Sequence, residues 1–166
     1  MALALAGRTA GHPVVLTMPE DAPALRQEYL LRLGAQILHS PRPAGPCGGP
    51  GGWQETTAAE KGWYYMNWLA NDDNPEYHRR VTGPAIVQAI SREGRSLVDT
   101  ITVGVGSAGT ITGVGETIKA WTNDVRIVAV EPFENQALGG GFTGGHGIPD
   151  IGYGIVPGNY NAYVVG

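Results

Sequence analysis

A glycine-rich segment, Gly104-Val-Gly-Ser-Ala-Gly-Thr110, constrains the fold more than any other feature of the sequence. It follows the β-branched run Val98–Val103 and precedes apolar residues that recur at helical spacing from Ile111 to Trp121. A second β-branched run, Val125–Val130, comes next. A strand, a tight glycine turn, a helix and a further strand in this order predict a parallel pair with a right-handed crossover. The fold class is therefore α/β with parallel strands.

The N-terminal part repeats this pattern. Pro13–Met18 and Gln36–His39 are predicted to be strands. Between them, apolar residues recur at helical spacing, and Gly34 follows the helix as a C-terminal cap prefers. The chain begins with the helix formers Met1–Ala6, which no capping residue precedes, so this helix resembles one cut in its middle.

The middle of the chain is less regular. Ser40–Gly52 is rich in proline and glycine and is predicted to be a loop, and Trp63–Met66 is predicted to be a short strand. A helix is expected from Pro75 to Ile90, with Asn74 as its N-cap and Pro75 at its first position. Gly83-Pro84 should bend or break that helix.

Charge and cysteine content exclude several classes of function. Fifteen acidic residues against eleven basic ones give a net charge of −4, and no basic run exceeds Arg79-Arg80. This balance argues against partners such as nucleic acid or an anionic membrane. The single cysteine, Cys47, cannot form an internal disulfide, which fits a reducing, cytoplasmic compartment. No spacing typical of a metal site is present, and Met1–Ala6 is too short to span a bilayer.

The glycine-rich segment favours an anion site. Unpaired N–H groups at a helix start carry the positive end of the helix dipole, glycines allow close approach, and hydroxyls add donors. A phosphate is the natural ligand; the alternative is a tight turn that binds nothing. Gly104, Gly106 and Gly109 also satisfy the dinucleotide fingerprint, with Glu131 placed 131 − 109 = 22 residues later. An NAD(P)-binding oxidoreductase domain is therefore the rival hypothesis.

The whole chain resembles the cysteine synthase family, the pyridoxal-phosphate enzymes of fold type II. The matching motifs occur in the family's order over nearly all of the chain: Leu16–Glu20, Leu33–Ala35, Asn74–Glu76, His78, Thr82–Pro84, Ile86, Gly104–Gly115, Val128–Pro132 and Ile151–Pro157. The resemblance implies pyridoxal 5'-phosphate as cofactor and an amino-acid substrate. It implies β-replacement or β-elimination on an O-activated serine, in a homodimer.

The resemblance also assigns candidate site residues. It places the cofactor's phosphate on Gly106, Ser107, Ala108, Gly109 and Thr110. Ser107 stands where the family usually has threonine, and Ala108 replaces a usual glycine. On the substrate side, Asn67-Trp68-Leu69 stands in place of a Gln-Gln-Phe pattern, so Asn67 and Trp68, with Gly152, are the substrate-binding candidates.

The family's Schiff-base lysine has no counterpart in this sequence. The only lysines are Lys61 and Lys119, and neither matches its position, so no catalytic residue is assigned. We expect the middle portion of such an enzyme, truncated at both ends, with residues 1–70 in a small mobile domain and 71–166 in the large cofactor-binding domain. A non-catalytic fragment or scaffold is the remaining alternative.

Other conspicuous residues have structural interpretations. His146 is expected at the surface, and Arg79 and Arg80 on a solvated helix face. Aromatic residues between Trp63 and Trp68 are expected in packing rather than in a stacking platform. Cys47 has no histidine near it in sequence, which argues against a catalytic thiol.

Overall fold

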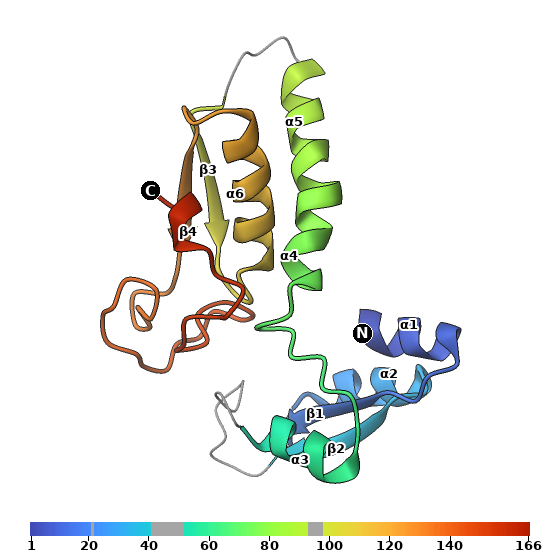
Figure 1. The fold of residues 1–166 in the computed structure, drawn as a ribbon. Coiled ribbons are helices and arrows are strands. Elements are labelled where there is room, and N and C mark those ends of the chain that lie inside the picture. The colour runs from blue at the N-terminus through green and yellow to red at the C-terminus, as the bar shows by residue number, and fades with distance from the viewer. Residues whose placement is uncertain (21, 41–51, 93–97) are drawn as a thin grey trace. The chain divides into compact units, whose positions relative to one another are not determined.

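The structure, a computed structural model, describes all residues except 21, 41–51 and 93–97. It divides into two compact units, Met1–Tyr65 and Met66–Gly166 (Figure 1). Most of the predicted loop Ser40–Gly52, with Cys47, lies outside the described residues. No helix in the described part of the chain is long and apolar enough to cross a membrane.

The first unit is built on a parallel strand pair. Its elements are α1 (Ala2–Ala10), β1 (Val15–Pro19), α2 (Ala24–Arg32), β2 (Gln36–Ser40) and α3 (Trp53–Lys61). β1 and β2 pair in parallel, with Val15 opposite Gln36, which confirms the predicted strand–helix–strand unit. Met1 is the N-cap of α1 and makes no side-chain capping bond, and the left-handed Gly11 is its C-cap.

The core of this unit is small. Ala4 of α1, Leu30 of α2 and Ala35 are buried together. α2 presents Leu25 and Tyr29 to the surface, 77% and 54% exposed, although both recur at helical spacing. The buried side of α2 is therefore the one that carries Leu30.

Two segments around the end of the first unit differ from the sequence prediction. Trp63–Met66 is not a strand, because its irregular backbone pairs with no strand among the described residues. Aromatic residues favour strands only where a partner strand and a packing surface are available. Helix α3 was not predicted from the sequence, since its sequence WQETTAAEK has little apolar periodicity; it ends at the left-handed Gly62.

The second unit repeats the parallel arrangement on a larger scale. Its elements are α4 (Asp73–Tyr77), the π-helical turn η1 (His78–Thr82), α5 (Gly83–Arg92), β3 (Thr100–Gly104), α6 (Gly109–Trp121), β4 (Arg126–Val130) and the 3-10 turn η2 (Ala162–Val164). β3 and β4 pair in parallel, with Thr100 opposite Arg126, and α6 is the crossover (Figure 1). The predicted strand–turn–helix–strand order is confirmed.

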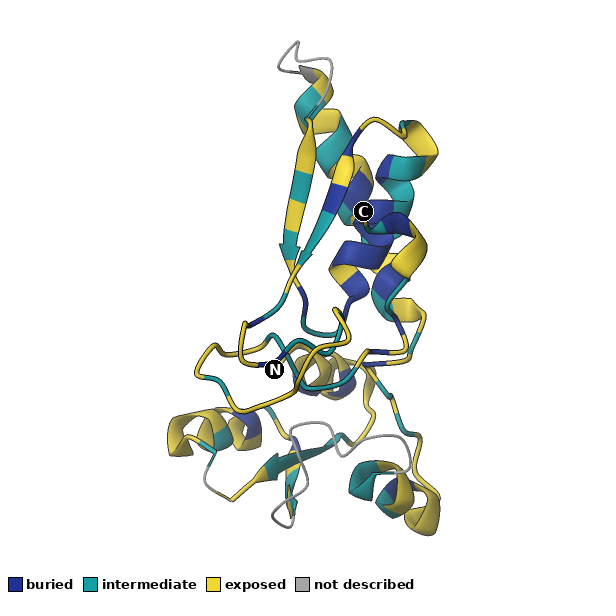
Figure 2. Ribbon diagram, turned by 90° about the vertical axis from the view of Figure 1, so that its left-hand side faces the viewer, coloured by how far each residue is buried: buried dark blue, intermediate teal, exposed yellow. Residues whose placement is uncertain are grey.

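Helix α6 is the centre of the second core (Figure 2). Its residues Ile111, Val114 and Ile118 are at most 1% exposed and pack with Val125 and Ile127 around β4. The predicted apolar face is thus buried, except at its C-terminal end, where Trp121 is 43% exposed.

The helix from α4 to α5 differs from the prediction in two ways. It begins at Asp73 with Asp72 as N-cap, so Asn74 lies inside the first turn and not at the cap. It also continues through Gly83-Pro84, because the π-helical turn comes first: the Gly83 amide bonds the carbonyl of His78, five residues back. Pro84, which has no N–H, then falls where the α-helical hydrogen-bond ladder is already interrupted.

Candidate phosphate-binding site

The glycine-rich loop runs from the end of β3 to the start of α6, as predicted. Two of its glycines are required by close packing. A Cβ on Gly106 would lie 2.4 Å from the carbonyl oxygen of Asp150, and one on Gly109 would lie 1.9 Å from Oδ1 of Asn74. Ala108 is the N-cap of α6 and has a φ of 64°, in the left-handed region that glycine adopts more readily.

The backbone of this loop offers hydrogen-bond donors. Within the described residues, the amide N–H groups of Gly106, Ser107 and Ala108 have no acceptor. The N–H groups in the first turn of α6 have no partner within the helix either, and the positive end of its dipole lies here. The donor set therefore fits a phosphate group.

The Ser107 hydroxyl is oriented by Asn74 of α4. Nδ2 of Asn74 donates to Oγ of Ser107 at 2.9 Å and to the carbonyl oxygen of Trp68 at 2.9 Å. Both amide hydrogens of Asn74 are thereby used. Because Oγ of Ser107 accepts a hydrogen bond, its own O–H remains able to donate to a bound anion.

The Thr110 hydroxyl also has a neighbour on this helix: His78, which lies one turn after Asn74. Oγ1 of Thr110 lies 3.2 Å from Nε2 of His78, and Nδ1 of His78 lies 2.9 Å from Oγ1 of Thr82. Burial lowers the pKa of His78, which favours a neutral ring. Sequence reasoning noted His78 only as part of a motif; its placement beside Thr110 depends on the packing of the helix on α6.

Of the substrate-binding candidates Asn67 and Trp68, Trp68 is linked to this loop by hydrogen bonds. The carbonyl oxygen of Trp68 accepts from Asn74 and, at 2.8 Å, from Nδ2 of Asn159. Asn159 also donates to the carbonyl oxygen of Ser107 at 3.2 Å. The Trp68 ring packs edge to face on Tyr153, with 5.5 Å between ring centroids, and Asn67 has a φ of 39°.

The third candidate, Gly152, lies next to the start of the loop. Its amide donates to the carbonyl oxygen of Val105 at 3.1 Å, and its carbonyl oxygen accepts from Asn135 at 3.1 Å and lies 2.7 Å from Nε2 of His146. A side chain here would collide with Pro132, and the φ of 63° also favours glycine. His146 was expected at the surface but is half-buried. The Ile148 amide donates to Nδ1 of His146. Nε2 of His146 must therefore carry a hydrogen, which it donates to the carbonyl oxygen of Gly152.

Glu131 does not present a free carboxylate at the end of β4. Its two oxygens accept hydrogen bonds from the amides of Leu138 and Gly139, at 2.8 and 2.9 Å. These bonds hold the loop that follows β4. The acid that the dinucleotide hypothesis requires for a ribose is thus engaged by backbone.

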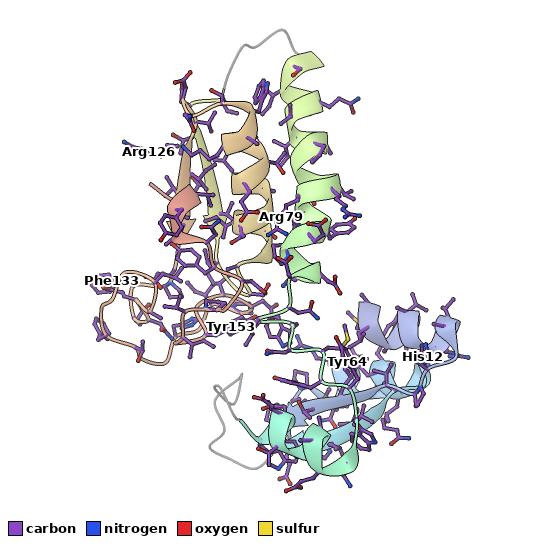
Figure 3. All side chains as sticks on the ribbon, in the orientation of Figure 1. His12, Tyr64, Arg79, Arg126, Phe133 and Tyr153 are labelled. Atoms are coloured by element: carbon purple, nitrogen blue, oxygen red, sulfur yellow. The ribbon has the colours of Figure 1, made fainter. Side chains whose placement is uncertain are left out.

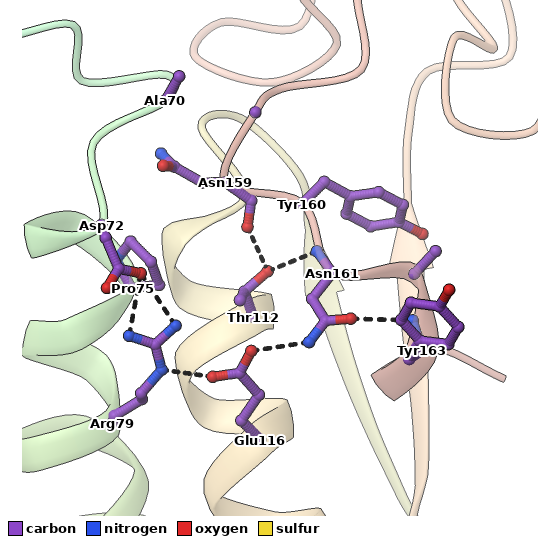
Figure 4. A pocket seen from close by; sticks show the side chains of 12 residues that line it. Ala70, Asp72, Pro75, Arg79, Thr112, Glu116, Asn159, Tyr160, Asn161 and Tyr163 are labelled. Atoms are coloured by element: carbon purple, nitrogen blue, oxygen red, sulfur yellow. Dashed lines mark hydrogen bonds and ion pairs between the residues drawn. The ribbon is translucent and has the colours of Figure 1, made fainter.

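A cavity of about 410 Å³ lies between the α4–η1 helix, α6 and the segment 158–163, and its polar lining centres on Arg79 (Figure 4). The Arg79 guanidinium donates to Asp72 at 3.1 Å, to Glu76 at 3.0 Å and also to Glu116. These carboxylates raise the pKa of Arg79. The prediction of a solvated helix face is therefore wrong for Arg79, which is labelled in Figure 3 and is held toward α6 by its ion pair with Glu116 (Figure 4).

The same cavity does not suit an anion. Three carboxylates surround the Arg79 guanidinium, so this part of the cavity lining has no unpaired positive charge. Nδ2 of Asn161 extends the network by donating to Oε1 of Glu116 at 2.7 Å. Oγ1 of Thr112 accepts a hydrogen bond from the backbone amide of Asn161 and donates to the carbonyl oxygen of Asn159. This network fixes α4, α6 and the C-terminal segment together. The loop before α6 remains the candidate phosphate site.

The fold and the loop define the class of protein. The model of the family described as "Pyridoxal-phosphate dependent enzyme" matches residues 1–162. The chain belongs to this family, whose cofactor is pyridoxal phosphate, and its fold is that of the fold-type-II enzymes.

Particular relatives narrow the resemblance to cysteine synthases. The chain is 33% identical over 162 residues to a cysteine synthase of Staphylococcus aureus, covering 98% of this chain and 51% of that protein. It is 35% identical over 159 residues to cysteine synthase 3 of Caenorhabditis elegans, covering 96% and 46%. The crystal structure of an O-ureido-L-serine synthase superposes with a TM-score of 0.88 at 28% identity, covering 99% and 51%. The chain thus spans about half the length of these relatives, and none of them supports the dinucleotide hypothesis.

Proposed function

We propose that this chain contributes the cofactor-phosphate site of an enzyme that replaces the β-substituent of an O-activated serine. The observation that carries the proposal is the loop from Gly106 to Thr110, whose amides and two hydroxyls are available to an anion. The names of the relatives, cysteine synthases and an O-ureido-L-serine synthase, support the substrate class. Bound pyridoxal phosphate supplies an electron sink that lets the α-proton and then the β-substituent of the amino acid leave.

The residues of the chain have separate parts in this proposal. The amides of Gly106, Ser107 and Ala108 and the N-terminus of α6 hold the phosphate, and the hydroxyls of Ser107 and Thr110 donate to its oxygens. Gly109 contributes its N–H and allows the helix to approach Asn74. This arrangement would hold the cofactor by its phosphate at the N-terminal end of α6.

On the substrate side we assign Asn67, Trp68 and Gly152. The carbonyl of Trp68 is tied to the phosphate loop through Asn74 and Asn159, so this segment keeps a fixed distance from a bound phosphate. We further assign residues 1–70 to a small domain and 71–166 to the large, cofactor-binding domain. The division of the structure into Met1–Tyr65 and Met66–Gly166 supports that assignment.

The experiment is a titration of the 166-residue chain with pyridoxal phosphate, with NAD in parallel. Replacing Ser107 and Thr110 together by alanine should weaken binding by about 1–3 kcal/mol, because two donors to a charged group are lost. A matched control, Ser91→Ala with Thr102→Ala, removes two exposed hydroxyls of the same unit outside the loop. Equal binding by the loop variant and the control would refute the site, and saturable NAD binding without a response to pyridoxal phosphate would refute the function.

The proposal includes self-association, as in a homodimer. Parallel strands are usually covered on both faces, yet alternate residues of β3 are exposed, and Val130 of β4 is 41% exposed. Tyr163 is fully exposed and Phe133 is 79% exposed. Sedimentation velocity over a range of micromolar concentrations tests this: a single monomeric species throughout would contradict it.

A further inference from the structure

We infer that His78 is a positioning residue for the phosphate site: its Nε2–H donates to Oγ1 of Thr110, which leaves the Thr110 hydroxyl hydrogen for the bound anion. This inference rests on the proposed function, because it concerns the phosphate held by the same loop. It adds His78 and Thr82, neither of which lies in the loop.

The direction of the hydrogen bonds follows from the two ring nitrogens. A neutral imidazole has one donor and one acceptor nitrogen. Oγ1 of Thr82 lies 2.9 Å from Nδ1 of His78, and its hydroxyl can donate to that nitrogen. The proton of the ring then lies on Nε2, 3.2 Å from Oγ1 of Thr110. Three groups in sequence thus point their hydrogens toward the loop: Thr82, His78 and Thr110.

The packing of two helices holds His78 within this distance. A Cβ on Gly113 of α6 would lie 2.2 Å from the carbonyl oxygen of Pro75 and 2.6 Å from Cβ of His78. Gly113 follows Thr110 by three residues, so both lie on the same face of α6. The absence of a side chain at Gly113 therefore lets the His78 turn approach Thr110.

The neighbouring residue Asn74 gives an independent precedent within the same helix. Asn74 and His78 are four residues apart and share a face. Asn74 donates to the hydroxyl oxygen of Ser107. We infer the same direction for His78 and the Thr110 oxygen, which lies 3.2 Å from Nε2. One helix thus occupies an oxygen lone pair of each hydroxyl, and each O–H is directed away from the helix, toward the anion.

The first test needs no cofactor. The chain has four histidines, and nitrogen-15 spectra of the histidine-labelled chain report which ring nitrogen carries the proton; His78→Gln assigns the His78 signals. We expect the proton of His78 on Nε2, and we expect Thr82→Val, which removes the hydroxyl at nearly constant shape, to shift this balance toward Nδ1. Thr82→Ser should restore the wild-type spectrum. A proton on Nδ1 in the unaltered chain would overturn the inference.

The second test measures affinity for inorganic phosphate and for pyridoxal phosphate. His78→Phe should weaken binding about 3–10-fold, the effect of one misdirected hydrogen bond. His78→Gln should stay within about twofold, because its amide N–H can replace Nε2–H as a donor. When His78→Phe is combined with Thr110→Val, it should cause no further loss of phosphate affinity. When it is combined with Ser107→Ala, it should cause the same loss as in the unaltered chain. Additive losses with Thr110→Val would show a general structural role and overturn the inference.

The two sets of results separate the inference from the proposed function. If Thr110→Val itself leaves phosphate binding unchanged, the loop is not the phosphate site and the proposed function fails. If Thr110→Val weakens binding while His78→Phe does not, only the role of His78 is wrong.

Discussion

The carboxylate of Glu131 accepts a hydrogen bond from the amide of Leu138 at 2.8 Å, seven residues further along the chain. The adjacent amide of Gly139 bonds the other carboxylate oxygen at 2.9 Å. Glu131 directly follows β4, where the dinucleotide hypothesis needs an acid for a ribose. The observed bonds give this residue a structural role, which is to anchor the loop that leaves the sheet.

Replacing Glu131 by glutamine should therefore reduce stability without affecting the phosphate site. Glutamine keeps one acceptor oxygen but turns an NH₂ group toward the second amide, at a cost of about 1–2 kcal/mol in unfolding free energy. Urea denaturation measures the loss, and a phosphate titration should show unchanged affinity. Glu134→Gln, a charge-matched change at an exposed position, is the control. Loss of phosphate affinity with intact stability would contradict this role.

The interaction between Arg79 and Glu116 should be the strongest ion pair in the Arg79 network. Both side chains are half-buried, at 28% and 27% exposure, so solvent screens their attraction less than it screens an exposed pair. A double-mutant cycle with Arg79→Met and Glu116→Gln should give a coupling of about 1–2 kcal/mol. Glu116→Gln retains an oxygen for Asn161, so the cycle isolates the charge.

The control cycle uses Arg32 and Glu28, an ion pair outside this network whose side chains are 76% and 57% exposed. Its coupling should stay below about 1 kcal/mol, as for exposed pairs in general. The two cycles are compared at low and high salt. Equal coupling in both would show that the burial of Arg79 has no energetic consequence.

Much of the second unit could be predicted from the sequence, because its signals are local and agree with each other. Two β-branched runs predict β3 and β4, and the glycine turn with the apolar helix face predicts α6. The burial of Ile111, Val114 and Ile118 follows from their helical spacing. α3 has no such periodicity. The aromatic run at Trp63–Met66 has the composition of a strand, but it pairs with no strand in the part of the chain that the structure describes, and pairing is not visible in a sequence.

The loop could be located as an anion site, but the groups that orient its hydroxyls could not. Asn74 was interpreted as a helix cap from its residue type and its position before proline, whereas the structure directs its amide to Ser107. His78 meets Thr110 across 32 residues. Such contacts depend on how two helices pack, here through Gly113, and helix packing cannot be read from local patterns.

Lys119 should form no stoichiometric covalent adduct with pyridoxal phosphate. Its Nζ donates to the carbonyl oxygens of Asn123 and Val125 at the C-terminal end of α6, at 3.3 and 2.8 Å. It follows Gly109 by ten residues, which places it about 15 Å from the phosphate loop along the helix. Borohydride reduction in the presence of the cofactor, followed by peptide mapping, measures this. A single stoichiometric pyridoxyl group on Lys119 would contradict the location of the site.

Ala108→Gly should leave the unfolding free energy within about 1 kcal/mol of the unaltered chain. Glycine relieves about 1–2 kcal/mol of left-handed backbone strain at a φ of 64°. It also loses about 0.8 kcal/mol from one buried methyl group and about 0.5–1 kcal/mol of chain entropy. These opposing effects nearly cancel, which explains how alanine is tolerated at a positive φ.

Two comparisons check the argument for Ala108. Ala108→Val should cost more than about 2 kcal/mol, because a β-branched residue resists positive φ and the site is only 3% exposed. Ala120→Gly, at an exposed helical position of α6, should cost about 1 kcal/mol. Thermal denaturation ranks the three variants, and equal destabilisation by both glycine substitutions would show that Ala108 is unstrained.

The stability of the chain should fall below about pH 6.5 through His78. Burial lowers the folded-state pKa of His78 below its ordinary value of 6.5, so the unfolded chain binds a proton more readily. Between the two pKa values the unfolding free energy therefore rises with pH, and it levels off above 6.5. Urea denaturation at closely spaced pH values should show this slope in the unaltered chain and in His12→Gln, a change at an exposed histidine. His78→Gln should remove the slope, and its persistence in that variant would assign the effect to another group.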